Sequence, residues 1–237
     1  MKYQVFTYRT SEGEARPGII INNRMYDLRD AMGIKYEAWR CIDDLLQNWP
    51  EANRALREIA VELEHSKNAA ELAADTIELL PPLTRCGVVY GAGANYRDHV
   101  EAMARAFNMK LVLDPKSDGI PPWHFIKAGQ ATLAGHKQEI PFPEHTNMLD
   151  WEAELAVIIG RRASRVSPDN ALEYVAGYSC ANDQSARDNL KRKQIDPSSP
   201  FRFDWIGHKC FTGACPLGPF ITPSEFIDSP ENLGIKL

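Results

Sequence analysis

The 237-residue sequence has no long apolar run, no secretion signal and no surplus of positive charge. Its most apolar stretch, residues 153–160, is far shorter than the roughly 18 residues of a membrane-spanning helix. The N-terminus lacks the hydrophobic segment of a signal peptide. Lysine and arginine number 27 against 32 acidic residues, a net charge of −5, whereas nucleic-acid-binding domains are typically basic. We therefore expect neither a membrane nor a nucleic acid as partner, and we expect a cytoplasmic protein.

The sequence is also poor in cysteine patterns and in nucleotide-binding motifs. Its five cysteines form no CxxC pair, and Cys210 with Cys215 is the closest spacing. This excludes the usual zinc spacings and predicts free thiols in a reducing compartment. The segment GAGANY lacks the third glycine and the later acid of a dinucleotide-binding fingerprint.

The first third of the chain predicts a small domain of strands and helices. Residues 18–21 and 25–28 flank an Asn22-Asn23 pair, which is typical of a β-hairpin. Residues 35–80 are expected to be helical, with the clearest amphipathic period over 51–64. Because the Pro81-Pro82 pair ends this pattern, we predict an N-terminal domain over 1–80 and a second domain over 83–237.

The second part alternates short apolar segments with polar loops, which predicts an α+β fold with a mostly antiparallel or mixed sheet. Helices are expected over 167–174 and 185–193, and residues 95–107 fit either a helix or a folded loop. The expected strands are 86–91, 123–127, 139–142, 155–159, 178–182 and 217–222.

Paired carboxylates give the strongest chemical signal. Glu152 and Glu154 precede an apolar strand and, at a spacing of two, project from the same face. Asp183 follows a second apolar strand. Three converging carboxylates would bind a hard cation, Mg²⁺ or Mn²⁺ before Ca²⁺. Taken singly, the glutamates also fit a solvated strand edge, and Asp183 fits a helix N-cap or Asx turn.

His99 is a candidate general base, since its ordinary pKa lies near neutral pH. A lone histidine more often has a surface or structural role.

Five blocks in order resemble one family: GAGANYRDH, FIKAG, DWEAELAVIIGR, YVAGYSCANDQSARD and HKCFTGACPLGPFITPSE. Together they are similar to the catalytic domain of the fumarylacetoacetate hydrolase superfamily, over about residues 83–237. The resemblance implies a mixed β-sandwich roll, a homodimer, and a divalent metal ion at the mouth of the roll.

The resemblance also implies roles for individual residues. Its metal ligands correspond to Glu152, Glu154 and Asp183, and its catalytic histidine to His99. Lys127, Lys209 and Arg187 would hold the oxygens of an anionic substrate, with Lys127 and Lys209 assisting catalysis, and Tyr96 would contact the substrate.

The implied reaction is metal-dependent hydrolysis of a C–C bond in a small 2,4-dioxo acid such as an acylpyruvate or fumarylpyruvate, as in aromatic catabolism. In this family His99 would activate a water, and cleavage would pass through a metal-bound enolate. Decarboxylation of oxaloacetate and isomerisation of an unsaturated dioate pass through the same enolate and are alternatives. A non-catalytic relative is a further alternative.

The sequence departs from the family at three places. Ala102 stands where many members carry a glutamate that orients the histidine, so either the segment is not a regular helix or another acid partners His99. Leu190 replaces a glutamine, which predicts a more apolar pocket and a bulkier substrate tail. The sequence stops at Leu237, at what looks like the start of a strand, so we expect the C-terminal part of the roll to lie outside it.

Overall fold

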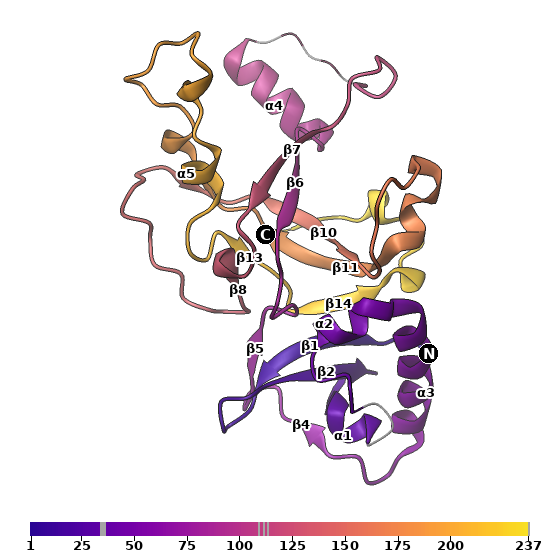
Figure 1. The fold of residues 1–237 in the computed structure, drawn as a ribbon. Helices are drawn as coiled ribbons and strands as arrows, with labels where there is room; N and C mark the ends of the chain where they lie inside the picture. Colours follow the sequence, from indigo (N-terminus) through magenta and orange to yellow (C-terminus); the bar gives the residue numbers. More distant parts are fainter. Residues whose placement is uncertain (34–36, 109, 111, 113, 237) are drawn as a thin grey trace.

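The computed structural model describes residues 1–33, 37–108, 110, 112 and 114–236. Its largest element is an eight-stranded antiparallel sheet in the order β10-β11-β14-β1-β2-β3-β4, with β5 also paired to β1 (Figure 1). These strands are β1 (Gln4–Arg9), β2 (Ala15–Ile21), β3 (Arg24–Asp27), β4 (Glu71–Leu72), β5 (Glu78–Leu80), β10 (Ala153–Ile159), β11 (Val175–Asn182) and β14 (Phe220–Pro223).

The N-terminal hairpin forms as predicted. Ile21 of β2 pairs with Arg24 of β3, so Asn22 and Asn23 make a two-residue loop. Their φ values of 50° and 63° lie in the left-handed region, which asparagine tolerates and which matches the twist of a hairpin. This backbone requirement explains why the pair of asparagines stands at the turn.

Helix α3 (Trp49–His65) covers one face of the sheet and confirms the predicted amphipathic helix (Figure 1). Its buried side chains include Ala55, Ile59, Ala60 and Leu63, the four predicted to share one face. Shorter helices α1 (Leu28–Met32) and α2 (Ile42–Leu45) precede it. The expectation of helix throughout 35–80 is wrong at its end, where β4 and β5 extend the sheet.

One core connects the first and last parts of the described chain. Val5 of β1 pairs with Ile221 of β14, and both side chains are fully buried among residues of β2 and α3. The sheet is therefore continuous across the expected boundary at Pro81-Pro82.

Three small ladders extend the second part: β6 (Val89–Gly93) with β7 (Trp123–Lys127), β8 (Leu133–Ala134) with β13 (Cys215–Pro216), and β9 (Leu149–Asp150) with β12 (Ser185–Ala186). The β8–β13 pair is parallel and the other two are antiparallel. In Figure 1, β6 and β7 lead away from the large sheet to helix α4 (Arg97–Phe107), with α5 (Trp205–Lys209) beside them. The predicted α+β class is confirmed.

Several local predictions are wrong. Residues 139–142 form no strand, and 185–193 form no α-helix but the short strand β12 and a 3₁₀ turn over Arg187–Asn189. The helix predicted over 167–174 is present, as a 3₁₀ helix over Pro168–Tyr174. Ile235 and Lys236 lie in no strand, and Leu237 lies outside the described residues.

Candidate metal centre and active site

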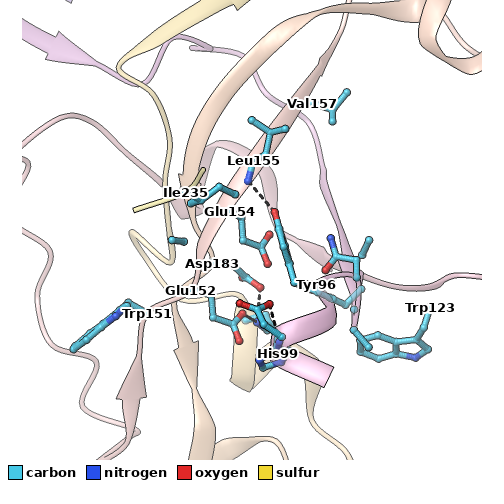
Figure 2. A pocket seen from close by; sticks show the side chains of 18 of the residues that line it. Tyr96, His99, Trp123, Trp151, Glu152, Glu154, Leu155, Val157, Asp183 and Ile235 are labelled. Atoms are coloured by element: carbon cyan, nitrogen blue, oxygen red, sulfur yellow. Dashed lines mark hydrogen bonds and ion pairs between the residues drawn. The ribbon is translucent and has the colours of Figure 1, made fainter. Parts of the chain in front are cut away.

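Backbone pairing at the ends of β10 and β11 brings three carboxylates together. Asp183, just after β11, donates its backbone N–H to the Glu152 carbonyl at 2.9 Å. Glu152 precedes β10 by one residue and Glu154 lies on it. One carboxylate oxygen of each of these three residues lies within 4.8 Å of the others, and Figure 2 shows the three side chains gathered in one pocket. The predicted convergence of Glu152, Glu154 and Asp183 is therefore present.

Lys209, the last residue of α5, lies buried against two of these carboxylates. Its Nζ donates to Glu152 Oε2 at 2.8 Å, to Ser185 Oγ at 2.6 Å and to Asp183 Oδ2. Asp183 is consequently an ion-pair partner and not the N-cap or Asx-turn residue that its position alone suggested.

Arg187 binds the outer side of the cluster. Its guanidinium donates to Asp150 Oδ2 at 2.9 Å and to Glu152 Oε1. Both Arg187 and Lys209 border the pocket, so both stand where a substrate anion could reach them.

Lys127 occupies a different place from Lys209. It is 2% exposed, and its Nζ donates to the carbonyls of Gln184, Lys209 and Ala214 at 3.0, 3.1 and 2.7 Å. An ammonium group has three protons, so these carbonyls use all of them. Lys127 lies behind Asp183, with Nζ 2.7 Å from Oδ1, and is not among the described residues that border the pocket.

The electrostatics of the cluster favour a bound cation. The pKa of Glu154 is raised to about 7, first by burial and then by the charges of Asp183 and Glu152, which outweigh the opposing charges of Lys209 and Lys127. The pKa of Glu152 falls to about 2: burial opposes this, but the hydrogen bond with Asp183 and the charges of Lys209 and Arg187 outweigh it. Negative charge thus remains in excess around Glu154.

Asp183 Oδ1 supports the same conclusion. It is buried, and its charged neighbour is Lys127, whose Nζ lies 2.7 Å away and also donates to three carbonyls. A buried carboxylate beside two other carboxylates fits an all-oxygen site for Mg²⁺ or Mn²⁺.

Helix α4 presents His99 to the same pocket. The segment is a regular helix, so the alternative of an irregular segment is wrong. His99 is exposed, and within the described chain its ring makes no hydrogen bond or ion pair. Glu101 faces Arg105, with 3.9 Å between their charged atoms, and no other acid of the described residues orients the His99 ring.

Tyr96, directly before α4, ties the helix to the strand that carries Glu154. Its hydroxyl accepts a hydrogen bond of 3.1 Å from the backbone N–H of Leu155, as Figure 2 shows. The ring borders the pocket and lies beside Glu154 in Figure 2.

The pocket has a volume of about 1210 Å³. Beyond the expected residues it includes several that the sequence alone did not indicate: Trp123 and Phe125 on β7, and Trp205 and His208 on α5. For Trp123 and Phe125 the sequence signal is aromatic residues at alternate positions of a strand, which the structure pairs with the glycines of GAGANY.

The profile of the fumarylacetoacetate (FAA) hydrolase C-terminal family matches residues 88–237, well over half of the chain. The chain belongs to this family. Every residue of the pocket falls inside the matched region.

Curated relatives and solved structures of the FAA hydrolase family carry several activities in their names. "Oxaloacetate tautomerase fahd2, mitochondrial" of Xenopus laevis is 33% identical over 70% of this chain. The "4-hydroxyphenylacetate degradation bifunctional isomerase/decarboxylase" of Salmonella dublin is 34% identical over 65% of it. The chain spans 46% and 32% of the lengths of these two relatives.

Two solved structures share the fold over nearly the whole chain. A fumarylacetoacetate hydrolase from psychrophilic Exiguobacterium antarcticum has a TM-score of 0.58 and 29% identity, covering 95% of this chain and 68% of its own. The maleylpyruvate hydrolase of Sphingobium sp. SYK-6, solved with manganese(II) and pyruvate, has a TM-score of 0.63 at 20% identity, covering 96% and 69%.

No helix in the described ranges combines the length and apolarity that crossing a membrane requires.

Proposed function

We propose that this chain is a metal-dependent enzyme that binds a small anionic 2-oxo acid and stabilises its enolate. The observation that carries the proposal is the set of three carboxylate oxygens within 4.8 Å of one another, bordered by Lys209 and Arg187. Glu152, Glu154 and Asp183 would hold Mg²⁺ or Mn²⁺, with Ca²⁺ a weaker fit. When bound, the ion supplies Lewis-acid polarisation of the 2-oxo group.

The side chains of the pocket have distinct tasks in this proposal. Lys209 and Arg187 bind the substrate carboxylate and the oxygen on which negative charge develops, because both offer charge-assisted hydrogen bonds at the edge of the cluster. Tyr96 fixes the start of α4 against β10 through Leu155, which keeps His99 facing the pocket.

The first candidate reaction is hydrolysis of a 2,4-dioxo acid. His99 accepts a proton from water, and the water oxygen bonds to the distal carbonyl carbon. The C3–C4 bond then breaks, its electron pair remains on C3 as an enolate, and protonation at C3 gives a 2-oxo acid beside a carboxylic acid. This reaction needs a strong base at His99.

The second candidate is reaction of a 2-oxo diacid without attack by water. In tautomerisation a proton moves between C3 and the 2-oxo oxygen; in decarboxylation the C3–C4 bond breaks, CO₂ leaves, and the electron pair on C3 is then protonated. The second candidate is favoured by one observation, that the described residues give His99 no acid partner. The name of the Xenopus relative, an oxaloacetate tautomerase, supports this candidate.

Turnover of acetylpyruvate, fumarylpyruvate and oxaloacetate, with Mn²⁺ or with chelator, tests the proposal. Metal-dependent formation of two acids identifies the hydrolase. Release of CO₂ identifies the decarboxylase, and exchange of the C3 protons for deuterium without fragmentation identifies the tautomerase. Turnover that survives chelation contradicts the proposed metal dependence. If the Mn²⁺-loaded protein turns over none of these substrates, the proposal that the chain is such an enzyme is contradicted. The homodimer also stays a proposal, which sedimentation at micromolar concentration tests.

A further inference from the structure

Three aromatic side chains form one wall of the pocket. Trp123 and Phe125 lie on the same face of β7, and Trp205 on α5 packs against both. The ring centroids of Trp123 and Trp205 are 4.5 Å apart, and those of Phe125 and Trp205 are 6.2 Å apart with nearly parallel planes. We call Trp123, Phe125 and Trp205 the aromatic wall.

The neighbouring strand is built to receive two of these rings. Gly91 of β6 stands opposite Phe125, and Gly93 stands opposite Trp123. A Cβ atom at Gly91 would lie 2.2 Å from Phe125 Cζ, and one at Gly93 would lie 1.9 Å from Trp123 Cε3. The rings therefore lie flat across backbone that has no side chain, which fixes their orientation. The glycines of GAGANY thus seat aromatic rings, which gives them a role other than phosphate binding.

One end of the aromatic wall lies next to Lys209, beside the carboxylate cluster of Glu152, Glu154 and Asp183. Lys209 Nζ lies 4.7 Å from the centroid of the Phe125 ring, and the same Nζ binds Glu152 and Asp183. A substrate head group at Lys209 would therefore direct its tail along Phe125 toward Trp123 and Trp205. Figure 2 shows Trp123 on the side of His99 and Tyr96 away from Glu152.

The size and lining of the pocket also indicate an apolar tail. A volume of about 1210 Å³ exceeds what a three-carbon acid can fill. The pocket is also lined by aliphatic side chains, namely Val157, Leu172, Leu190, Leu233 and Ile235.

The charge balance disfavours a second carboxylate on the substrate. Among the described residues that border the pocket, six are acids and two, Arg187 and Lys209, are lysine or arginine. Both cations lie against the carboxylate cluster, where they would serve the head group. His208 is buried, which lowers its pKa and keeps it neutral, and it bonds to the Ala186 carbonyl. Apart from His99, which the proposal uses as a base, the described residues of the pocket thus offer no cation to a distal anion.

We propose that the aromatic wall is a tail subsite, and that the enzyme selects 2-oxo acids with an uncharged aryl or similarly bulky apolar tail over short-chain and dicarboxylic ones. This inference rests on the proposed function for its head group, and it assigns the substrate class within it.

The kinetic test compares benzoylpyruvate, acetylpyruvate and fumarylpyruvate on the full Mn²⁺-loaded chain. We expect kcat/KM to be at least about tenfold higher for benzoylpyruvate than for the other two. Trp205→Ala should lower kcat/KM for benzoylpyruvate about tenfold and for acetylpyruvate less than about twofold. Gly93→Ala, which displaces Trp123 without truncating it, should shift selectivity in the same direction. Phe201→Ala is the matched control, because Phe201 is 74% exposed and lies outside the pocket. It should change kcat/KM for neither benzoylpyruvate nor acetylpyruvate.

A binding experiment tests the tail subsite independently of the proposed catalytic function. Calorimetry with phenylpyruvate and pyruvate needs no turnover, and phenylpyruvate should bind at least about tenfold tighter to the wild type but not to Trp205→Ala. Tighter binding of phenylpyruvate without any turnover would overturn the proposed enzymatic activity and support the tail subsite. Turnover with a preference for fumarylpyruvate, or equal losses on both substrates in Trp205→Ala, would overturn the subsite and leave the enzyme standing.

Discussion

Two lysines flank Asp183, and their surroundings divide their tasks. Lys209 faces the pocket and shares its protons among two carboxylates and a hydroxyl. Lys127 lies behind, where it gathers the carbonyls of three separate residues around one ammonium group. The sequence predicted that both would hold substrate oxygens, but the contacts of Lys127 favour a role in positioning Asp183 and the end of α5.

We expect Lys127→Met to destabilise the protein even without metal or substrate. The change removes a hydrogen-bond donor from three carbonyls, of which that of Ala214 keeps the backbone N–H of Gln184, and it leaves Asp183 with Lys209 as its one close lysine. Breaking a buried charge pair typically costs about 3–5 kcal/mol. Urea denaturation of the metal-free variant measures the loss. A variant of unchanged stability with only a raised KM would instead place Lys127 in contact with the substrate.

The raised pKa of Glu154 predicts how the stability and the metal binding of the protein depend on pH. Its pKa is about 7 in the folded chain against 4.5 ordinarily, so between these values the folded state holds a proton that the unfolded state has lost. Metal-free stability should therefore fall as pH rises from about 4.5 to 7. Glu154→Gln removes the buried charge and should stabilise the metal-free protein at pH 8 by roughly 1–3 kcal/mol, with no gain at pH 4.

The same substitution should abolish stabilisation by Mn²⁺. In the wild type, a Mn²⁺ ion bound as proposed would displace the proton of Glu154, so the rise in thermal midpoint on adding Mn²⁺ should grow between pH 6 and 8. Thermal melts of both proteins across this range, with and without Mn²⁺, provide the measurement. An equal Mn²⁺ response in Glu154→Gln would remove Glu154 from the metal site.

At the scale of elements, the sequence predicted the turns and helices whose conformation depends on residues close together in the chain. The Asn22-Asn23 turn follows from backbone conformation, and the buried face of α3 follows from helical periodicity. Residues 185–193 could not be predicted in this way, because β12 pairs with β9 and the tertiary contact of Arg187 with Asp150 overrides helix propensity. The aromatic wall was equally out of reach, since it joins side chains about 80 residues apart in the sequence.

Helix α4 allows a direct test of the hydrolytic reaction. Ala102 is exposed and lies three residues after His99 on a regular helix, so a glutamate there would face the imidazole. We expect Ala102→Glu to hold and orient the His99 imidazole and to increase hydrolysis of acetylpyruvate at least about tenfold. Ala106→Glu adds the same charge one turn further on and should have little effect. If Ala102→Glu leaves kcat and its pH profile unchanged, His99 is not the base in that reaction.

At the scale of the whole molecule, the large sheet joins the two parts that the sequence predicted as separate domains. Strand β14 pairs with β11, which belongs to the second part of the chain, on one side and with β1 of the N-terminal part on the other. Arg57 of α3 also forms an ion pair with Glu225, just after β14. The carboxylates stand at the far ends of β10 and β11 in this same sheet, so the N-terminal strands support the strands that carry the site.

This continuity predicts that the chain unfolds as one unit. Ile221 is fully buried beside Val5, and Ile221→Ala should lower the free energy of unfolding by about 2–5 kcal/mol, since it leaves a cavity between the two parts. Val61→Ala, at a 47%-exposed position on α3, is the control and should change it by less than about 0.5 kcal/mol. Tryptophan fluorescence and loss of Mn²⁺ binding should report one coincident transition, shifted equally by Ile221→Ala. Two separate transitions, with Mn²⁺ binding retained by an isolated 83–237 fragment, would instead establish two independent domains and would mean that β1 does not support the site.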